Sequence, residues 1–334
     1  MTQKKSLRTV LYSISQDSFH PFLKKIENSN MGARLASGLF WSMAGSVISR
    51  GLMLCATVLV ARMLGVTVYG ELGMVQSTIG MFGVLAGFGL GLTATKHVAE
   101  FRERDPERAG RIIGISSLFA MGTGGLMALG LLVCAPWLSD SINAPHLVGV
   151  LRIGAAILFI NALNGAQTGA LAGFEAFKDI AVVNLLIGFI SFPILVLGAY
   201  FAGLTGVVWA LAINLCFNWF LNYIALRKQV RHHNIVVNFK SLSKELPIIR
   251  SFALPAAISA MFAAPANWVV RSLLANEPNG YTELSFLTAA LVFQGLLLFV
   301  GSMLSGPLLS LISNAGDKVD SKLSTFNILS SWYI

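Results

Sequence analysis

Long apolar runs alternate with short polar segments along most of the chain. A helix that crosses the hydrocarbon core of a bilayer needs roughly 20 mostly apolar residues, and eight segments satisfy this requirement. These runs are continuous rather than alternating, so they predict helices and not the strands of a membrane barrel. The predicted spans are residues 35–61, 72–95, 112–134, 147–172, 179–202, 204–226, 251–273 and 284–306. The pattern therefore predicts an all-α fold, a polytopic helical membrane protein with about eight transmembrane helices.

Composition agrees with this prediction. Charged residues make up 12% of the chain and hydrophobic residues 55%, whereas soluble domains carry about 25% charged residues. All three cysteines fall inside predicted spans, where a cysteine behaves as a small hydrophobic residue. The His232–His233 pair has no further Cys or His near it, so neither a metal site nor a cofactor is predicted.

Basic residues gather on one side of the predicted membrane. With eight spans, both ends of the chain and every even-numbered connection lie on the same side. Most of the 24 Lys and Arg residues fall there, chiefly in residues 1–34, 96–111 and 227–250. The positive-inside rule then predicts cytoplasmic termini and a multi-pass protein of the cytoplasmic (inner) membrane. The positive net charge reflects topology, so nucleic acid is not a predicted partner.

One span boundary occurs twice in the chain. The stretch VLVARMLGVTVYGELGMVQS is matched about two hundred residues later by WVVRSLLANEPNGYTELSFLTAA, with Arg62 aligned to Arg271 and Glu71 to Glu283. Six predicted spans separate the copies, and because six is even, both copies cross in the same direction. This is typical of two parallel helical bundles related by an axis along the membrane normal.

The repeat predicts how the chain is organised. The chain ends in FNILSSWYI, which resembles the start of a ninth span, so the second bundle is expected to be cut short. The predicted parts are a cytoplasmic basic tail (1–34), a first six-helix bundle (35–226), a cytoplasmic linker (227–250) and an incomplete second bundle (251–334).

An arginine in the middle of the first span is the strongest candidate for a functional residue. Ser42 and Ser46 precede Arg50 by eight and four residues, which places all three on one helical face. An Arg at bilayer depth costs at least about 2.5–3.5 kcal/mol, so it should face a polar interior. A guanidinium matches phosphate oxygens bidentately, which predicts that Arg50 binds a diphosphate. The alternative is a structural partner for a carbonyl or an Asn on a neighbouring helix.

Amide side chains form stripes in other spans. Such groups are costly in lipid unless they face the bundle interior. Two interpretations stay open: a hydrophilic cavity that holds sugar hydroxyls, or hydrogen bonds between helices. The candidate cavity residues are Gln76 of the second span, Asn161, Asn164 and Gln167 of the fourth, and Asn214, Asn218 and Asn222 of the sixth.

Charged residues at the outer span ends and prolines in the seventh span suggest moving parts. The arginines either extend to lipid headgroups or gate the protein through pairs with nearby carboxylates. Proline removes a helical hydrogen bond and bends a helix, so it predicts a hinge or a fixed kink. The gating candidates are Arg62, Glu71, Arg271 and Glu283, and the hinge candidates are Pro255 and Pro265.

The first repeat also resembles a known family. ARMLGVTVYGELGMVQS and the following GVLAGFGLGLTATKHVAE are similar to the start of the O-antigen and polysaccharide (Wzx-like) flippases. These belong to the multidrug/oligosaccharidyl-lipid/polysaccharide exporter superfamily. The region of Pro255 and Trp268 resembles that family's seventh span.

The resemblance implies a function. It implies a flippase that moves undecaprenyl-diphosphate-linked oligosaccharides, such as O-antigen or capsule repeat units, across the membrane by alternating access. The implied partners are that polyprenyl-diphosphate-linked oligosaccharide, membrane lipids and the polysaccharide polymerase machinery. Family members have a fuller second bundle than this chain.

The same residues bear on three other function classes. A membrane glycosyltransferase needs acidic or metal-binding loops, but the outer loops are short and no predicted span contains a His, so an enzyme is not predicted. A cation-coupled small-molecule exporter needs a buried carboxylate, and no predicted span has one at its centre. A non-transporting membrane assembly partner stays open as an alternative.

Overall fold

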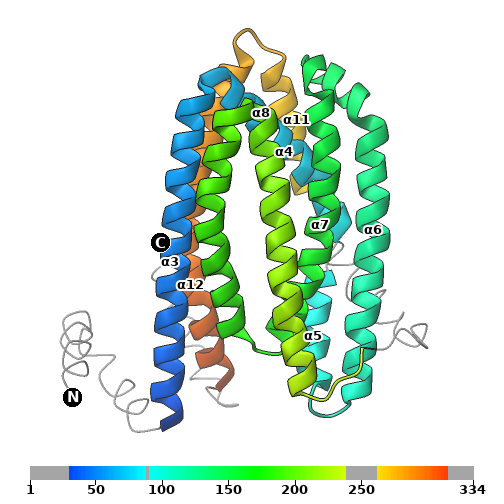
Figure 1. Cartoon of the computed structure of the whole chain (residues 1–334), viewed down its shortest axis with the longest axis vertical. Helices are drawn as coiled ribbons and strands as arrows, with labels where there is room; N and C mark the ends of the chain where they lie inside the picture. The colour runs from blue at the N-terminus through cyan, green and yellow to red at the C-terminus, as the bar shows by residue number, and fades with distance from the viewer. Residues whose placement is uncertain (1–29, 88–89, 238–261, 315–334) are drawn as a thin grey trace, which may run out of the picture.

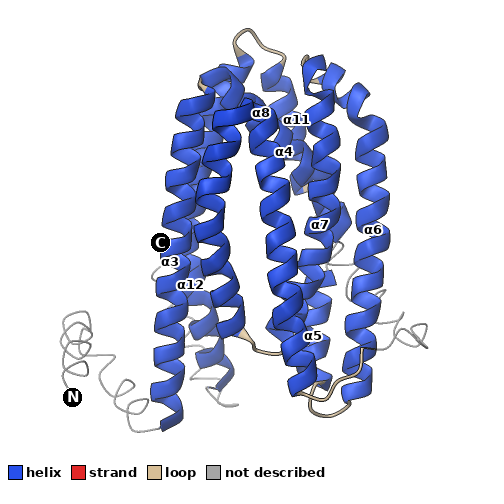
Figure 2. Ribbon diagram, viewed as in Figure 1, coloured by secondary structure: helices blue, strands red, loops and turns tan. Residues whose placement is uncertain are grey.

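The fold is a bundle of long helices. The computed structural model describes residues 30–87, 90–237 and 262–314, and within these ranges it contains helices and turns but no strand (Figure 2). The helices are α3 (Asn30–Leu64), α4 (Val66–Gly87), α5 (Leu90–Phe101), α6 (Pro106–Ser141), the short 3₁₀ helix η2 (Pro145–Leu147), α7 (Val148–Gly173), α8 (Phe177–His232), α11 (Ala263–Ala275) and α12 (Gly280–Asn314). The predicted all-α fold is confirmed.

Six helical stretches within the described residues are long and apolar enough to cross a membrane. They correspond to α3, α4 with α5, α6, η2 with α7, α8 and the first part of α12, and they match the predicted spans in order. The predicted seventh span is described only from residue 262 onward, where the 13-residue helix α11 begins. The chain is therefore a multi-pass membrane protein.

Helix α8 contains the predicted fifth and sixth spans as two antiparallel arms. Its backbone leaves helical geometry at Ala202 and at Gly203, where φ is +55°, a conformation that glycine adopts without steric cost. The arms then pack closely, because a Cβ on Gly206 would lie 2.0 Å from the carbonyl oxygen of Gly198. Sequence analysis placed the break between these spans at the same glycine.

Several helices extend beyond the predicted spans into segments predicted as loops. Helix α6 starts at Pro106, and the Asp105 carboxylate caps it by accepting a hydrogen bond from the backbone N–H of Arg108. Helix α8 continues to His232, past the predicted start of the linker at residue 227. The Asp179 carboxylate accepts a 3.0 Å bond from Lys228 there and ties the final turns to the first arm.

Connections between helices alternate between the two ends of the bundle (Figure 1). One end, called here the hairpin end, carries the α3–α4, α6–α7 and α11–α12 connections and the turn inside α8. The opposite end carries the α5–α6 and α7–α8 connections. The two copies of the repeated boundary thus lie at the same end, as the parallel-repeat prediction requires.

Helices α4 and α12 approach each other closely near the hairpin end. A Cβ built on Gly70 would lie 1.9 Å from the carbonyl oxygen of Tyr281, and one on Gly73 would lie 2.1 Å from the Thr288 hydroxyl. Only glycine permits backbones this close, as is common in membrane helix packing. Gly70 and Gly73 therefore set the distance between the first bundle and α12.

Substitution of Gly70 should weaken this contact. We expect Gly70→Ala to push α12 away and to destabilise the protein by about 1–3 kcal/mol, the usual cost of overpacking. A thermal unfolding curve of the purified protein in detergent measures this as a drop of several degrees. Gly80→Ala on the same helix is the control, because a Cβ at Gly80 meets nothing within 4 Å. An equal effect of both substitutions would contradict the close-contact explanation.

Candidate functional site

A cavity of about 520 Å³ lies between α3, both arms of α8 and α12. Its walls come from residues far apart in sequence, because α3 packs along α8 and α12 lies beside α3. The cavity has one polar side and one apolar side. Polar residues from α3 and α8 form one side: Ser49, Arg50, Thr57, Asn184, Ser191 and Asn214. Apolar residues from all three helices form the rest: Met53, Leu54, Ile187, Leu291, Val292 and Leu296.

The polar side is held by hydrogen bonds between α3 and α8. The Ser49 hydroxyl donates to the carbonyl oxygen of Asn184 at 2.9 Å, which needs the close approach that Gly188 allows. The Asn214 amide donates to the Ser191 hydroxyl and links the two arms of α8. The side chains on this wall are therefore positioned by the fold before any ligand arrives.

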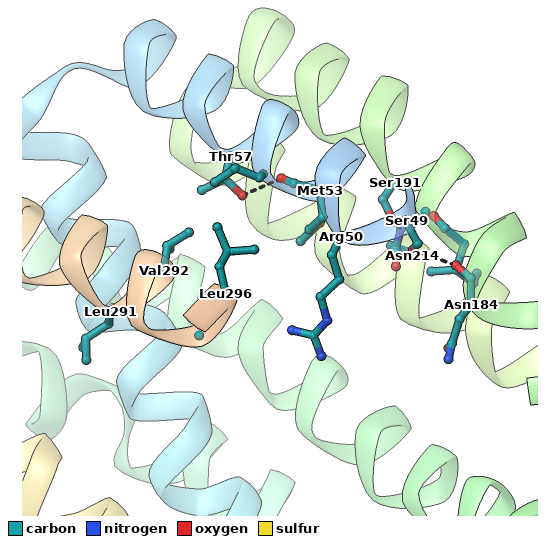
Figure 3. A pocket seen from close by; sticks show the side chains of 14 residues that line it. Ser49, Arg50, Met53, Thr57, Asn184, Ser191, Asn214, Leu291, Val292 and Leu296 are labelled. Atoms are coloured by element: carbon teal, nitrogen blue, oxygen red, sulfur yellow. Dashed lines mark hydrogen bonds between the residues drawn. The ribbon is translucent and has the colours of Figure 1, made fainter. Parts of the chain in front are cut away.

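Arg50 brings positive charge into this cavity. In Figure 3 its side chain extends from α3 into the cavity, between Leu296 on one side and Asn184 and Asn214 on the other. The described residues that line the cavity include no carboxylate. The arrangement can bind an anionic, hydroxyl-rich group against the polar side while an attached apolar group contacts α12.

The predicted amide stripes divide between two roles. Asn222 of α8 is buried and donates to Asn164 at 2.6 Å, which joins α7 to α8, and it donates within α8 to Asn218 at 2.7 Å. The Gln167 amide faces Trp219 of α8, and one orientation satisfies both groups: its nitrogen donates to the Trp219 carbonyl and its oxygen accepts from the indole N–H. For Asn164, Asn222 and Gln167 the structure shows the interhelical bonds of the second interpretation.

The other predicted cavity residues lie elsewhere. Asn214 lines the cavity and also bonds across α8. Asn161 and Gln76 are exposed and outside the lining of this cavity. Ser46 belongs to α3, and its side chain lies outside the described residues.

The gating candidates have partners other than those suggested by the sequence. Glu71 is paired with His146 of η2, with 3.0 Å between carboxylate oxygen and ring nitrogen. Arg271 donates to the carbonyl oxygen of Gly73 at 3.2 Å. Arg62 and Glu283 are exposed, and the described residues show no ion pair from Arg62 to Glu71 or from Arg271 to Glu283. Tertiary contacts with η2 and α4 engage Glu71 and Arg271, and a gating role for these four residues stays a prediction.

The hinge prediction is only partly described. Pro255 lies outside the described residues. Pro265 lies in the first turn of α11, which begins at Ala263. The residues that precede Phe262 lie outside the described residues, so the hinge or fixed kink at Pro265 stays a prediction.

Sequence analysis missed two groups of residues. Asn184 and Ser191, which line the cavity, are seven residues apart in the fifth span, and this helical spacing was a usable signal. Three hydrogen bonds at the hairpin end were not foreseeable, because their acceptors are supplied by distant segments. They run from Trp268 to Thr78, from Asn276 to the Ser141 carbonyl and from Tyr281 to the Ile142 carbonyl.

Asn222 provides a test of the interhelical bonds. We expect Asn222→Ala to lower the free energy of unfolding by about 1 kcal/mol, because two interhelical contacts, to Asn164 and Thr168 of α7, are lost at about 0.6 kcal/mol each. Thermal unfolding in detergent measures the change. The matched control is Asn161→Ala, which removes an exposed amide from α7. Equal unfolding temperatures for both variants would contradict a structural role for Asn222.

The fold and the cavity define a class of protein. A bundle of membrane-spanning helices with an amphipathic cavity between them defines a polytopic helical membrane protein. The family model described as "Polysaccharide biosynthesis protein" matches residues 35–290, and the chain belongs to this family.

Curated relatives agree with this membership. The chain is 28% identical over 179 residues to the Lipid III flippases of Escherichia coli (strain K12) and Shigella flexneri. Each match covers 52% of this chain and 42% of the relative, so the chain matches less than half the length of these curated relatives.

The fold is shared with a multidrug resistance MATE family transporter of the MOP superfamily. Its inward-facing structure has a TM-score of 0.67 at 17% identity and covers 86% of this chain and 68% of that one. The outward-facing structure has a TM-score of 0.64 at 18% identity, with 88% and 66% covered. At this identity the likeness concerns the fold alone.

Proposed function

We propose that this protein is a flippase for polyprenyl-diphosphate-linked oligosaccharides, such as O-antigen or capsule repeat units. The observation that carries the proposal is the amphipathic cavity with Arg50 beside Asn184, Ser191 and Asn214. Family membership and the similarity to Lipid III flippases support a lipid-linked sugar as the cargo.

The chemistry of the cavity matches the chemistry of such a lipid. A guanidinium binds phosphate oxygens strongly because its donors match their geometry. Hydroxyl and amide groups of Ser49, Asn184 and Asn214 suit the hydroxyls of a sugar. The apolar residues of α12 provide a surface for the first part of the lipid chain. One cavity therefore contacts all three parts of the molecule.

The direction of transport follows from the proposed orientation. Arg102 and Arg104 of the α5–α6 connection and Lys178 in the first turn of α8 lie at the end opposite the hairpin end, and the positive-inside rule favours the cytoplasm for that end. The cargo would then move from the cytoplasmic to the outer leaflet of the inner membrane. Alternating access fits a fold whose structural neighbours occur in inward-facing and outward-facing conformations.

A cation-coupled exporter is the weaker proposal. Binding of Na⁺ or a proton in a membrane usually relies on an ionisable carboxylate. The described cavity lining presents Arg50 and no Asp or Glu, which favours an anionic cargo.

The proposal is tested in cells that lack this gene. We expect a complete polyprenyl-linked repeat unit to accumulate and to clear when the gene is restored, as measured by mass spectrometry of extracted lipid-linked glycans. Restoration with the 334-residue chain tests whether this polypeptide suffices. If no lipid-linked glycan accumulates, including in strains without other flippases, the proposal is overturned.

Arg50 is tested in the same assay. We expect Arg50→Ala to reduce clearance about tenfold or more, because a hydrogen bond to a charged group contributes about 1.5–3 kcal/mol. Arg50→Lys should restore part of the activity, because it keeps the charge but loses the bidentate geometry. Arg227→Ala removes an exposed arginine near the end of α8 and is the charge-matched control. Normal clearance by Arg50→Ala would contradict its proposed role.

A further inference from the structure

A second recess adjoins the cavity on the side of the hairpin end. It has a volume of about 350 Å³ and lies between α3, α4 and α12. Leu54, Thr57 and Val292 line both the recess and the cavity. Figure 3 shows Thr57 and Val292 together on one side of the Arg50 side chain. The two spaces are therefore neighbours that share one wall.

The recess differs chemically from the cavity. Val58, Ala61, Val66, Ala289 and Phe293 supply most of its remaining surface. The Thr57 hydroxyl donates to the Met53 carbonyl at 2.8 Å within α3, so this polar group is already satisfied by its own helix. Such a lining favours a hydrocarbon over a sugar or a phosphate.

Two arginines of α3 show how the cavity and the recess are arranged along the helix. Arg50 extends into the cavity, and Arg62 lines the recess in the last turn of α3. The two arginines are 12 residues apart in one helix, which corresponds to about 18 Å along its axis. A lipid whose diphosphate contacts Arg50 would therefore have its chain pointing along the recess toward the hairpin end.

We propose that this recess holds the polyisoprenoid chain of the lipid-linked substrate next to its diphosphate. This inference rests on the proposed function and identifies the binding site of the apolar part of the cargo. An apolar recess that adjoins the cavity containing Arg50 matches a lipid with one chain per head group. Glycerophospholipids have two chains per head group, so they fit this arrangement less well. The direction also agrees with a lipid that enters from the cytoplasmic leaflet, whose chain points toward the outer leaflet.

Binding to the purified chain in detergent tests the recess without requiring transport. The probes are undecaprenyl diphosphate and geranyl diphosphate, which share a head group and differ in chain length, offered together and measured by native mass spectrometry. We expect the wild type to prefer the long chain about fivefold, a modest ratio because the chain gains packing rather than escape from water.

Two matched pairs of variants test whether the preference for the long-chain diphosphate arises in the recess. Val58→Trp fills the recess, and Leu59→Trp is its control, since the two residues are 43% and 40% exposed and only Val58 lines the recess. Phe293→Ala removes part of the opposite wall, and Phe286→Ala is its control at 61% exposure against 59%. We expect both recess variants to bind the two probes about equally and both controls to keep the preference.

The outcomes separate the two proposals. If Val58→Trp and Phe293→Ala keep the wild-type preference, the recess proposal is overturned and the flippase proposal stands. Equal competition by phosphatidylglycerol for the long-chain site would also overturn it, because the recess would then be a general lipid site. If the wild type binds neither diphosphate, the flippase proposal itself fails. Thermal unfolding confirms folding, and Phe293→Ala carries the test if Val58→Trp does not fold.

Discussion

Hydrocarbon offers no hydrogen-bonding partner to a polar group, and this constraint explains where the polar side chains of this protein lie. Asn222 and Asn164 bond to each other between α7 and α8. Ser49 bonds to a backbone carbonyl of α8, and Asn214 bonds to Ser191 across the α8 hairpin. The bonds of Ser49 and Asn214 both hold helices together and shape the polar side of the cavity. Stability and the proposed binding site thus depend on one set of contacts.

Close approach between helices is the second determinant of the arrangement. Gly70 and Gly73 let α12 contact α4 near the hairpin end, and Trp268, Arg271, Asn276 and Tyr281 add hydrogen bonds from the second hairpin to the first bundle there. The recess begins near that end, and the cavity lies farther from it, where α12 faces α3. In an alternating-access cycle, the contacts at the hairpin end are those that would have to break.

Arg50 is a cavity residue that could be predicted from the sequence alone. Its position in the middle of an apolar run predicted a polar interior beside it, and the structure places it in a cavity with Asn184 and Asn214. The amide side chains that were also predicted to line a cavity differ from Arg50. Asn164, Gln167 and Asn222 form hydrogen bonds with neighbouring helices instead. Helical spacing defines a face of a helix, but it does not say which neighbour that face contacts.

The sequence by itself determined the helical class, the order of the spans and the turn at Gly203, because each depends on local hydrophobicity or local backbone geometry. It also predicted the repeated boundary, which the structure places at one end of the bundle (Figure 1). Only the tertiary structure decided that Glu71 contacts His146 and that Arg271 contacts the Gly73 carbonyl. It alone brought α12 beside α3 to form the cavity and the recess. These outcomes depend on contacts between residues 75 to more than 200 positions apart, for which the sequence carries no local signal.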